Sequence, residues 1–121
     1  MNWQPAAPGA NSLYALVVHM LGTTEENLLG LLVGQPMPRG REAEFVVEAG
    51  SASVFGARWG ELRPRLAAML TALTPAALDQ TYNHPRRGAI TGRDVLIVVA
   101  RHAVEHLGQA ELTRDLLRAA R

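Results

Sequence analysis

Apolar residues recur at helical spacing in three long segments of this 121-residue chain. In the first segment, bulky apolar side chains return every three or four positions up to about Val33, as on one face of an α-helix. Asn11 or Ser12 is expected to cap this helix, and Gly34 to end it. His19 lies mid-helix on a neighbouring stripe of small and polar residues, which is typical of a face that lines a cavity.

The second apolar segment follows a long irregular connection over residues 35–51, of a length typical of a lid or of a crossover at the end of a helical bundle. Ser51 or Ser53 can cap this second helix, which should run to about residue 73. Pro64 falls inside it, so the pattern predicts either a kink there or a helix that begins near Arg63. The sequence leaves both possibilities open.

A short helix should then begin at Thr74-Pro75, a capping residue followed by proline at the first helical position, and end near Tyr82. Residues 83–88 read as a turn in which His84 is expected to be exposed. Thr91-Gly92-Arg93-Asp94 resembles a capping box that starts the third long helix.

This last helix is expected to reach the C-terminus. Its first part, residues 95–100, is an apolar block wide enough to be buried on every side, and the remainder alternates apolar and charged residues. Three long helices and one short one predict an all-α protein, an up-down helical bundle forming a single domain over residues 1–121.

Composition narrows the function classes. The chain has no cysteine, which excludes disulfides, thiolate metal sites and a cysteine nucleophile. Its 12 basic residues are all arginine and are spread along the chain, and the net charge is only +1, so we expect no nucleic-acid partner. No apolar run approaches the roughly 20 residues of a membrane span, and the N-terminus lacks signal-peptide features. A cytoplasmic protein without a membrane contact is therefore expected.

Candidate chemistry centres on three histidines. His102 and His106 stand four residues apart in the last helix, so their side chains project from one face, about 6 Å apart at Cβ. His19 is also mid-helix, and two packed helices about 8–10 Å apart could bring all three imidazoles to one ion. Three neutral ligands leave positions open for water or substrate, as in catalytic metal sites. Nearby, Glu26 and Glu105 are candidates for proton transfer, and Gln109 for orienting a ligand.

Two other interpretations of these residues remain. A histidine pair on an amphipathic helix can simply be half-exposed, and a lone histidine such as His19 is commonly a hydrogen-bonded packing residue. The segment from His102 to His106 also fits the HxxEH pattern of a metalloprotease class, with Glu105 as general base, but those enzymes are much larger than this chain.

The segment from about Trp3 to Arg118 resembles the DinB-like/YfiT-like superfamily of small metal-binding helical bundles. The matching pieces are Pro8-Gly9-Ala10-Asn11-Ser12-Leu13 before the helix with His19, the stretch Leu73-Thr74-Pro75-Ala76-Ala77-Leu78, and His102-x-x-x-His106-Leu107-Gly108-Gln109. The resemblance implies that His19, His102 and His106 bind a divalent ion such as zinc or nickel. It also implies relatives among thiol-dependent S-transferases and mycothiol-dependent maleylpyruvate isomerases.

The chain departs from the family pattern at its start, where the family normally has another long helix before the Pro-Gly-x-Asn-Ser segment. A truncated four-helix bundle would leave one apolar side uncovered, so we expect a homodimer. Two functions remain open at this stage. One is a metal-dependent transferase or hydrolase that activates a low-molecular-weight thiol or water against a small molecule. The other is a non-enzymatic dimerisation or binding module with weak or no metal binding.

Overall fold

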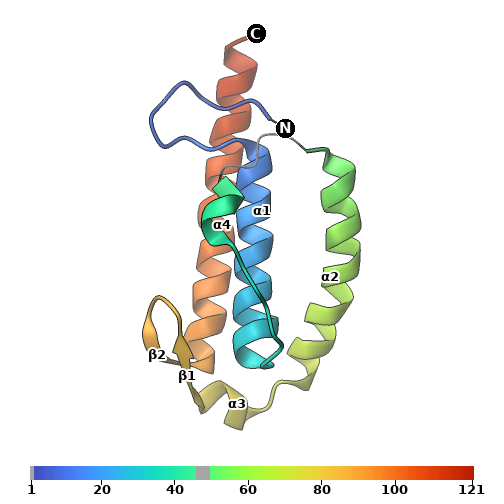
Figure 1. Cartoon of the computed structure of the whole chain (residues 1–121), viewed down its shortest axis with the longest axis vertical. Coiled ribbons are helices and arrows are strands. Elements are labelled where there is room, and N and C mark those ends of the chain that lie inside the picture. The colour runs from blue at the N-terminus through green and yellow to red at the C-terminus, as the bar shows by residue number, and fades with distance from the viewer. Residues whose placement is uncertain (1, 46–49) are drawn as a thin grey trace.

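The computed structural model describes residues 2–45 and 50–121. It is mostly helical, as predicted, with a small two-stranded hairpin in addition (Figure 1). The elements in chain order are α1 (Leu13–Thr24), η1 (Glu25–Leu32), η2 (Arg41–Phe45), α2 (Ala52–Ala72), α3 (Pro75–Asp79), β1 (Thr81–His84), β2 (Gly88–Thr91) and α4 (Gly92–Ala119).

The first long helix begins where its cap predicts and changes pitch halfway. The side-chain oxygen of Ser12 accepts a hydrogen bond from the Ala15 amide at 3.1 Å, which satisfies one of the free N–H groups at the start of α1. At Glu25 the α-helix continues without a break into η1, which is a π-helix. The π-helix is rare in proteins overall, and where it occurs it is often found at functional sites. Gly34 follows with a φ of +79°, the left-handed conformation in which glycine commonly ends a helix.

The connection after this helix is irregular, as expected, except for the 3-10 turn η2. This turn packs against α1. The predicted connection over residues 35–51 also includes residues 46–49, which lie outside the described part of the chain. The position of η2 is important because it brings a carboxylate, Glu44, into the side of α1.

The second long helix runs through its proline. Of the two possibilities that the sequence left open, a late start near Arg63 is wrong, because α2 extends from Ala52 to Ala72 with Pro64 inside it. Buried side chains on either side of the proline, Leu62 and Leu66, fix both halves against the core. The free energy gained by this burial offsets the loss of the backbone hydrogen bond that proline, which has no N–H, cannot donate.

The region between α2 and α4 differs from the prediction. The short helix α3 begins at its Thr74 cap but ends at Asp79, not near Tyr82. The residues expected to form its end and the following turn instead form an antiparallel hairpin in which Tyr82 pairs with Ile90 and His84 with Gly88. His84, expected to be exposed, is only 5% exposed. Exposed and less exposed positions alternate along β1, as side chains do in a strand, so His84 lies on the same inner face as Tyr82.

The last helix has the predicted start and reaches residue 119. The hydroxyl of Thr91 accepts from the Asp94 amide at 3.2 Å, while the Asp94 carboxylate accepts from the Thr91 amide at 3.0 Å, which completes the capping box. The apolar block over residues 95–100 is not buried on every side, because Ile97 is 63% exposed while Val95 is fully buried. This part of α4 therefore keeps one apolar side toward solvent.

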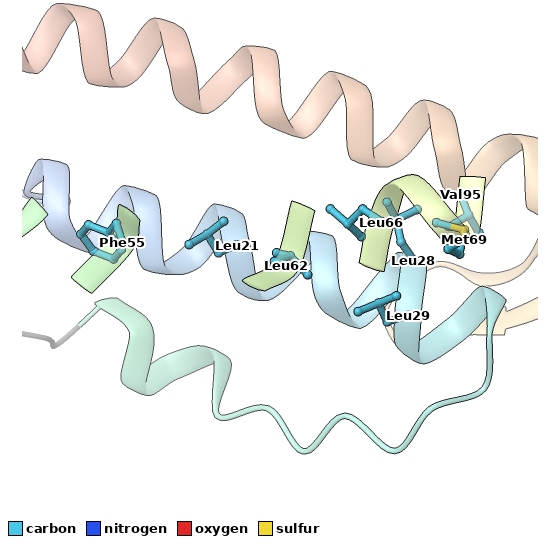
Figure 2. Packing of buried hydrophobic residues seen from close by; sticks show 8 residues of the cluster. All are labelled: Leu21, Leu28, Leu29, Phe55, Leu62, Leu66, Met69 and Val95. Carbon is cyan, nitrogen blue, oxygen red and sulfur yellow. The ribbon is translucent and has the colours of Figure 1, made fainter. Parts of the chain in front are cut away.

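A compact apolar core lies between the first helix, α2 and the start of α4 (Figure 2). Its buried members are Leu21, Leu28, Leu29, Phe55, Leu62, Leu66, Met69 and Val95. Helices α1 and α4 lie side by side along much of their length (Figure 1). This pairing brings the middle of α1 opposite the middle of α4, where the three predicted ligands are located. None of the helices in the described ranges is both long enough and apolar enough to cross a bilayer.

Candidate metal centre

Three imidazole rings from two helices converge on one point. The Nε2 atom of His102 lies 3.0 Å from Nε2 of His19 and 3.0 Å from Nε2 of His106. One nitrogen from each ring lies within 4.8 Å of the other two. Two nitrogens bound to one zinc ion at about 2.0–2.1 Å stand roughly 2.9–3.3 Å apart at angles between about 90° and 109°. The spacing of the three nitrogens therefore suits a shared divalent ion.

Hydrogen bonds on the far side of two rings set which nitrogen faces this point. His19 Nδ1 lies 2.9 Å from a carboxylate oxygen of Glu44, and His106 Nδ1 lies 2.6 Å from the amide oxygen of Gln109. Both oxygens only accept, so we assign the ring proton to Nδ1 in each case. The Nε2 atoms of His19 and His106 then carry lone pairs, which is the form that binds metal.

The carboxylate that orients His19 is itself held by an arginine. Arg39 donates from Nε to Glu44 Oε1 and from Nη2 to Glu44 Oε2, each at 2.7 Å, and from Nη1 to Glu26 at 2.7 Å. Arg39 Nη2 also lies 3.3 Å from His19 Nδ1. We attribute this longer approach to their shared partner Glu44, because two donors do not bond to each other. The Thr23 hydroxyl accepts a further bond from Arg39 at 2.9 Å.

These contacts fix the charge states of the cluster. Burial raises the pKa of the Glu44 carboxyl, but hydrogen bonds from Arg39 and His19 outweigh it, so the pKa lies below its ordinary value. The pKa of Glu26 is lowered in the same way by Arg86 and Arg39 against the effect of burial. Burial, followed by the neighbouring imidazoles, lowers the pKa of His102 to about 4. At neutral pH the centre therefore combines a neutral His102 with the ionised carboxylates of Glu26 and Glu44.

Gly22 makes room for this arrangement. A Cβ atom at this position of α1 would lie 2.3 Å from Glu44 Oε1 and 3.0 Å from Arg39 Nε. Any larger residue would have to displace the ion pair that supports His19. Glycine is thus required here by the close approach of η2 to the helix.

The other predicted site residues occupy different positions. Gln109 contacts His106 directly, as expected of a residue that orients a ligand. Glu26 reaches the centre only through Arg39, and it also pairs with Arg86. Glu105 is exposed and pairs with Arg101 at 3.3 Å. Sequence reasoning missed Glu44 and Arg39, which lie in the irregular connection.

A cavity of about 370 Å³ opens beside the three histidines. Two of the rings, those of His19 and His102, form part of its wall. The other lining residues are Thr23, Asn27, Arg41, His84, Arg86, Arg87 and Val98. A small molecule in this cavity would lie next to the rings of His19 and His102.

Comparisons with known proteins agree with this geometry. The family model described as the DinB superfamily matches residues 1–110. The chain belongs to the DinB superfamily. DinB proteins are helical and typically bind metal, and in this DinB chain three histidines lie where one ion could be held.

One curated protein similar to this DinB chain is an adenosylcobinamide-GDP ribazoletransferase of Halorubrum lacusprofundi, 33% identical over 112 residues. The match covers 90% of this chain but 42% of that protein, so the chain spans less than half of its length. No solved structure matches.

Proposed function

We propose that this chain is a metal-dependent enzyme that uses a three-histidine centre to act on a small molecule, as a thiol transferase or a hydrolase. The observation that carries the proposal is the convergence of three Nε2 atoms beside a cavity of about 370 Å³. A purely structural site fills all four positions of a zinc ion with protein ligands, whereas three leave one for a reactant. Zinc and nickel are the proposed ions, because both are well suited to imidazole.

The ion, when bound, lowers the pKa of a coordinated water or thiol toward neutrality and so supplies a nucleophile. The chain's own residues hold the ligands in place. Glu44 orients His19 and Gln109 orients His106, so two of the three rings are fixed in direction before any ion binds. The third, His102, stands between them.

Two carboxylates remain as proposed proton acceptors, with different support. Glu26 accepts a hydrogen bond from Arg86, which lines the cavity. It is ionised, but its hydrogen bonds with two arginines lower its pKa and make it a weak base. Its contacts favour a positioning role through Arg39. Glu105 is exposed beside Arg101, three residues from His102, and would need to change rotamer to reach a reactant.

A thiol-transfer screen tests this proposal. Zinc-loaded and nickel-loaded protein is mixed with a low-molecular-weight thiol and chlorodinitrobenzene, or with nitrophenyl acetate alone for hydrolysis. Activity that depends on metal and is lost in His102→Ala supports the proposal, and Glu111→Ala, which changes an exposed residue of the same helix outside the cavity, serves as the control. Equal rates for the wild-type protein and His102→Ala across both metals would argue against an enzyme.

A second candidate, a helical dimerisation module, is favoured by one specific observation. An almost wholly apolar cavity of about 380 Å³ lies between α1, α2 and α4, lined in part by Val17, Phe55 and Val99. Trp59 at its edge is 46% exposed, more than expected for so large an apolar residue. We propose that a second copy of the chain covers this groove, since a net charge of +1 offers little repulsion between copies. Dimerisation is compatible with the metal centre, which lies on a different cavity.

A further inference from the structure

Arginine side chains gather around the cavity beside the three histidines. Three of its lining residues, Arg41, Arg86 and Arg87, are arginines, from η2 and from the turn between the two strands of the hairpin. These segments are more than 40 residues apart in sequence, so the gathering is produced by the fold. We infer that this cavity binds a small anionic molecule, through a carboxylate or phosphate group held by these arginines. This inference names the substrate class of the proposed function. Anion binding itself does not require the metal-dependent reaction, and only the role of the anion as a substrate rests on the proposed function.

Among the described residues, the arginines at the cavity outnumber the carboxylates that pair with them. Arg39 and Arg86 share two carboxylates, Glu26 and Glu44, in the network described above. Arg41 and Arg87 form no ion pair within residues 2–45 and 50–121, although Arg41 stacks over the Phe45 ring at 5.5 Å. Within the described part of the chain, these two guanidinium groups therefore have no carboxylate partner. A divalent ion on the histidines would add further positive charge to the same wall.

Guanidinium groups select the ligand class by geometry as well as charge. Their planar fork donates two parallel hydrogen bonds to a carboxylate or a phosphate, and such charge-assisted bonds are among the strongest in proteins. Aromatic stacking of the kind seen for Arg41 fixes the plane of the fork and reduces the conformational freedom lost on binding. A neutral molecule would leave these donors unmatched.

Two buried polar residues complete the cavity wall. The Nδ1 atom of His84 accepts a hydrogen bond from the Arg86 amide at 3.1 Å, so in the neutral ring the proton lies on Nε2. His84 thus adds a donor to a site rich in donors. Asn27 is 1% exposed, and its amide donates to the Thr23 carbonyl at 2.8 Å, but its side-chain oxygen has no partner among the described residues. This buried acceptor needs a donor, so it would accept from a hydroxyl group or water in the cavity and not pair with the anionic oxygens, which only accept.

The position of the arginines also orients the ligand. Because His19 and His102 line the same cavity, an anionic group held by Arg41 and Arg87 leaves the rest of the molecule near these two histidines. We therefore assign the substrate to small organic acids or phosphate esters whose reactive centre is separate from the anionic group. The arginines would determine specificity and leave the chemistry to the metal centre.

Binding of simple anions to the metal-free chain of 121 residues tests the assignment without requiring activity. Glutarate, inorganic phosphate and glutaramide, a neutral isostere of glutarate, are titrated while amide resonances are followed by NMR. We expect an anion, but not glutaramide, to shift the backbone amides of Arg86 and Arg87, whose side chains line the cavity. Stronger binding of glutarate than of phosphate would indicate a carboxylate ligand, and the reverse a phosphate ligand.

Variants locate the site and separate this inference from the proposed function. Arg87→Gln should weaken anion binding about tenfold, the loss expected for one pair of charge-assisted hydrogen bonds. Arg63→Gln removes the same charge from the exposed surface of α2 and should have no effect. Equal shifts by glutarate and glutaramide, or equal losses in the two variants, would overturn the anion site. Zinc binding without anion binding would refute only this inference, and anion binding without zinc binding would refute only the metal centre.

Discussion

A carboxylate oxygen of Glu44 lies 2.9 Å from His19 Nδ1, although 25 positions separate the two residues in sequence. Both side chains are almost completely shielded from solvent, and Arg39 closes the network by two hydrogen bonds to the same carboxylate. A histidine held in this way presents Nε2 in a fixed direction. The irregular segment after the first helix thus determines the geometry of the centre as much as the helices do.

Removal of Glu44 should weaken metal binding more than it weakens the fold. We expect Glu44→Ala to lower zinc affinity about 10- to 100-fold, because His19 loses the acceptor that fixes its tautomer and direction. Glu42→Ala, which removes an exposed carboxylate from the same turn, is the matched control. Competition with a chelating dye measures the affinity. Unchanged affinity in Glu44→Ala would show that His19 needs no orienting partner.

Gly22→Ala should impair the centre although alanine is the better helix former. Alanine favours a helix by about 1 kcal/mol over glycine, but its Cβ would lie 2.3 Å from Glu44 Oε1. We expect weaker zinc binding with helix content unchanged by circular dichroism. Gly60→Ala in α2 meets no atom within 4 Å and should leave zinc binding unaffected. If both variants bind zinc like the wild-type protein, the glycine is not required by the ion pair.

The part of the site carried by regular helices could be predicted from the sequence. The spacing of His102 and His106 puts both on one face of any helix, and mid-helix positions in packed neighbours bring His19 within reach. Glu44 and Arg39 could not be predicted, because an irregular connection has no periodicity from which to infer the direction of a side chain. Only the charge of these residues within a proline-rich segment was visible.

The same limit explains the errors in the fold. Three long helices, the Ser12 cap and the capping box at Thr91 follow from apolar periodicity and local hydrogen bonding. Ser51 precedes α2, as predicted, but its side chain makes no capping hydrogen bond. The hairpin has four-residue strands without a clear alternation of apolar and polar positions, so its pairing is set by tertiary contacts. The sequence therefore predicted an exposed His84, whereas the fold buries this residue in the wall of the cavity.

The capping box should make the start of α4 sensitive to acid. Hydrogen bonds from Thr91 lower the pKa of Asp94 below its ordinary value of 3.8. A carboxyl group whose pKa is lower in the folded than in the unfolded protein stabilises the fold. This stabilisation is complete above the pKa of the unfolded state and is lost as the pH falls through the pKa of the folded state. We expect Thr91→Ala to cost about 1 kcal/mol at pH 7, measured by urea unfolding, and the difference from wild type to shrink below pH 4. Thr71→Ala, in the exposed part of α2, is the control. A constant difference at all pH values would contradict the role of Asp94.

The apolar groove gives a prediction about oligomeric state. We expect the wild-type chain to be a dimer by light scattering coupled to gel filtration, and Trp59→Glu to be a monomer with a similar helix content. Trp59 is already 46% exposed, so the change places a charge at the proposed interface without opening the core. Thr71→Glu puts the same charge elsewhere on α2 and should stay dimeric. A wild-type monomer at all concentrations would refute the proposed dimer.

The stoichiometry of zinc binding, measured by calorimetry on the wild-type chain and two histidine variants, tests the central claim most directly. The account predicts one ion per chain for the wild-type protein, none for His102→Ala, and one for His84→Ala, because only the first of these variants removes a nitrogen from the converging set. Absence of zinc and nickel binding in the wild-type protein, or equal loss in both variants, would contradict it.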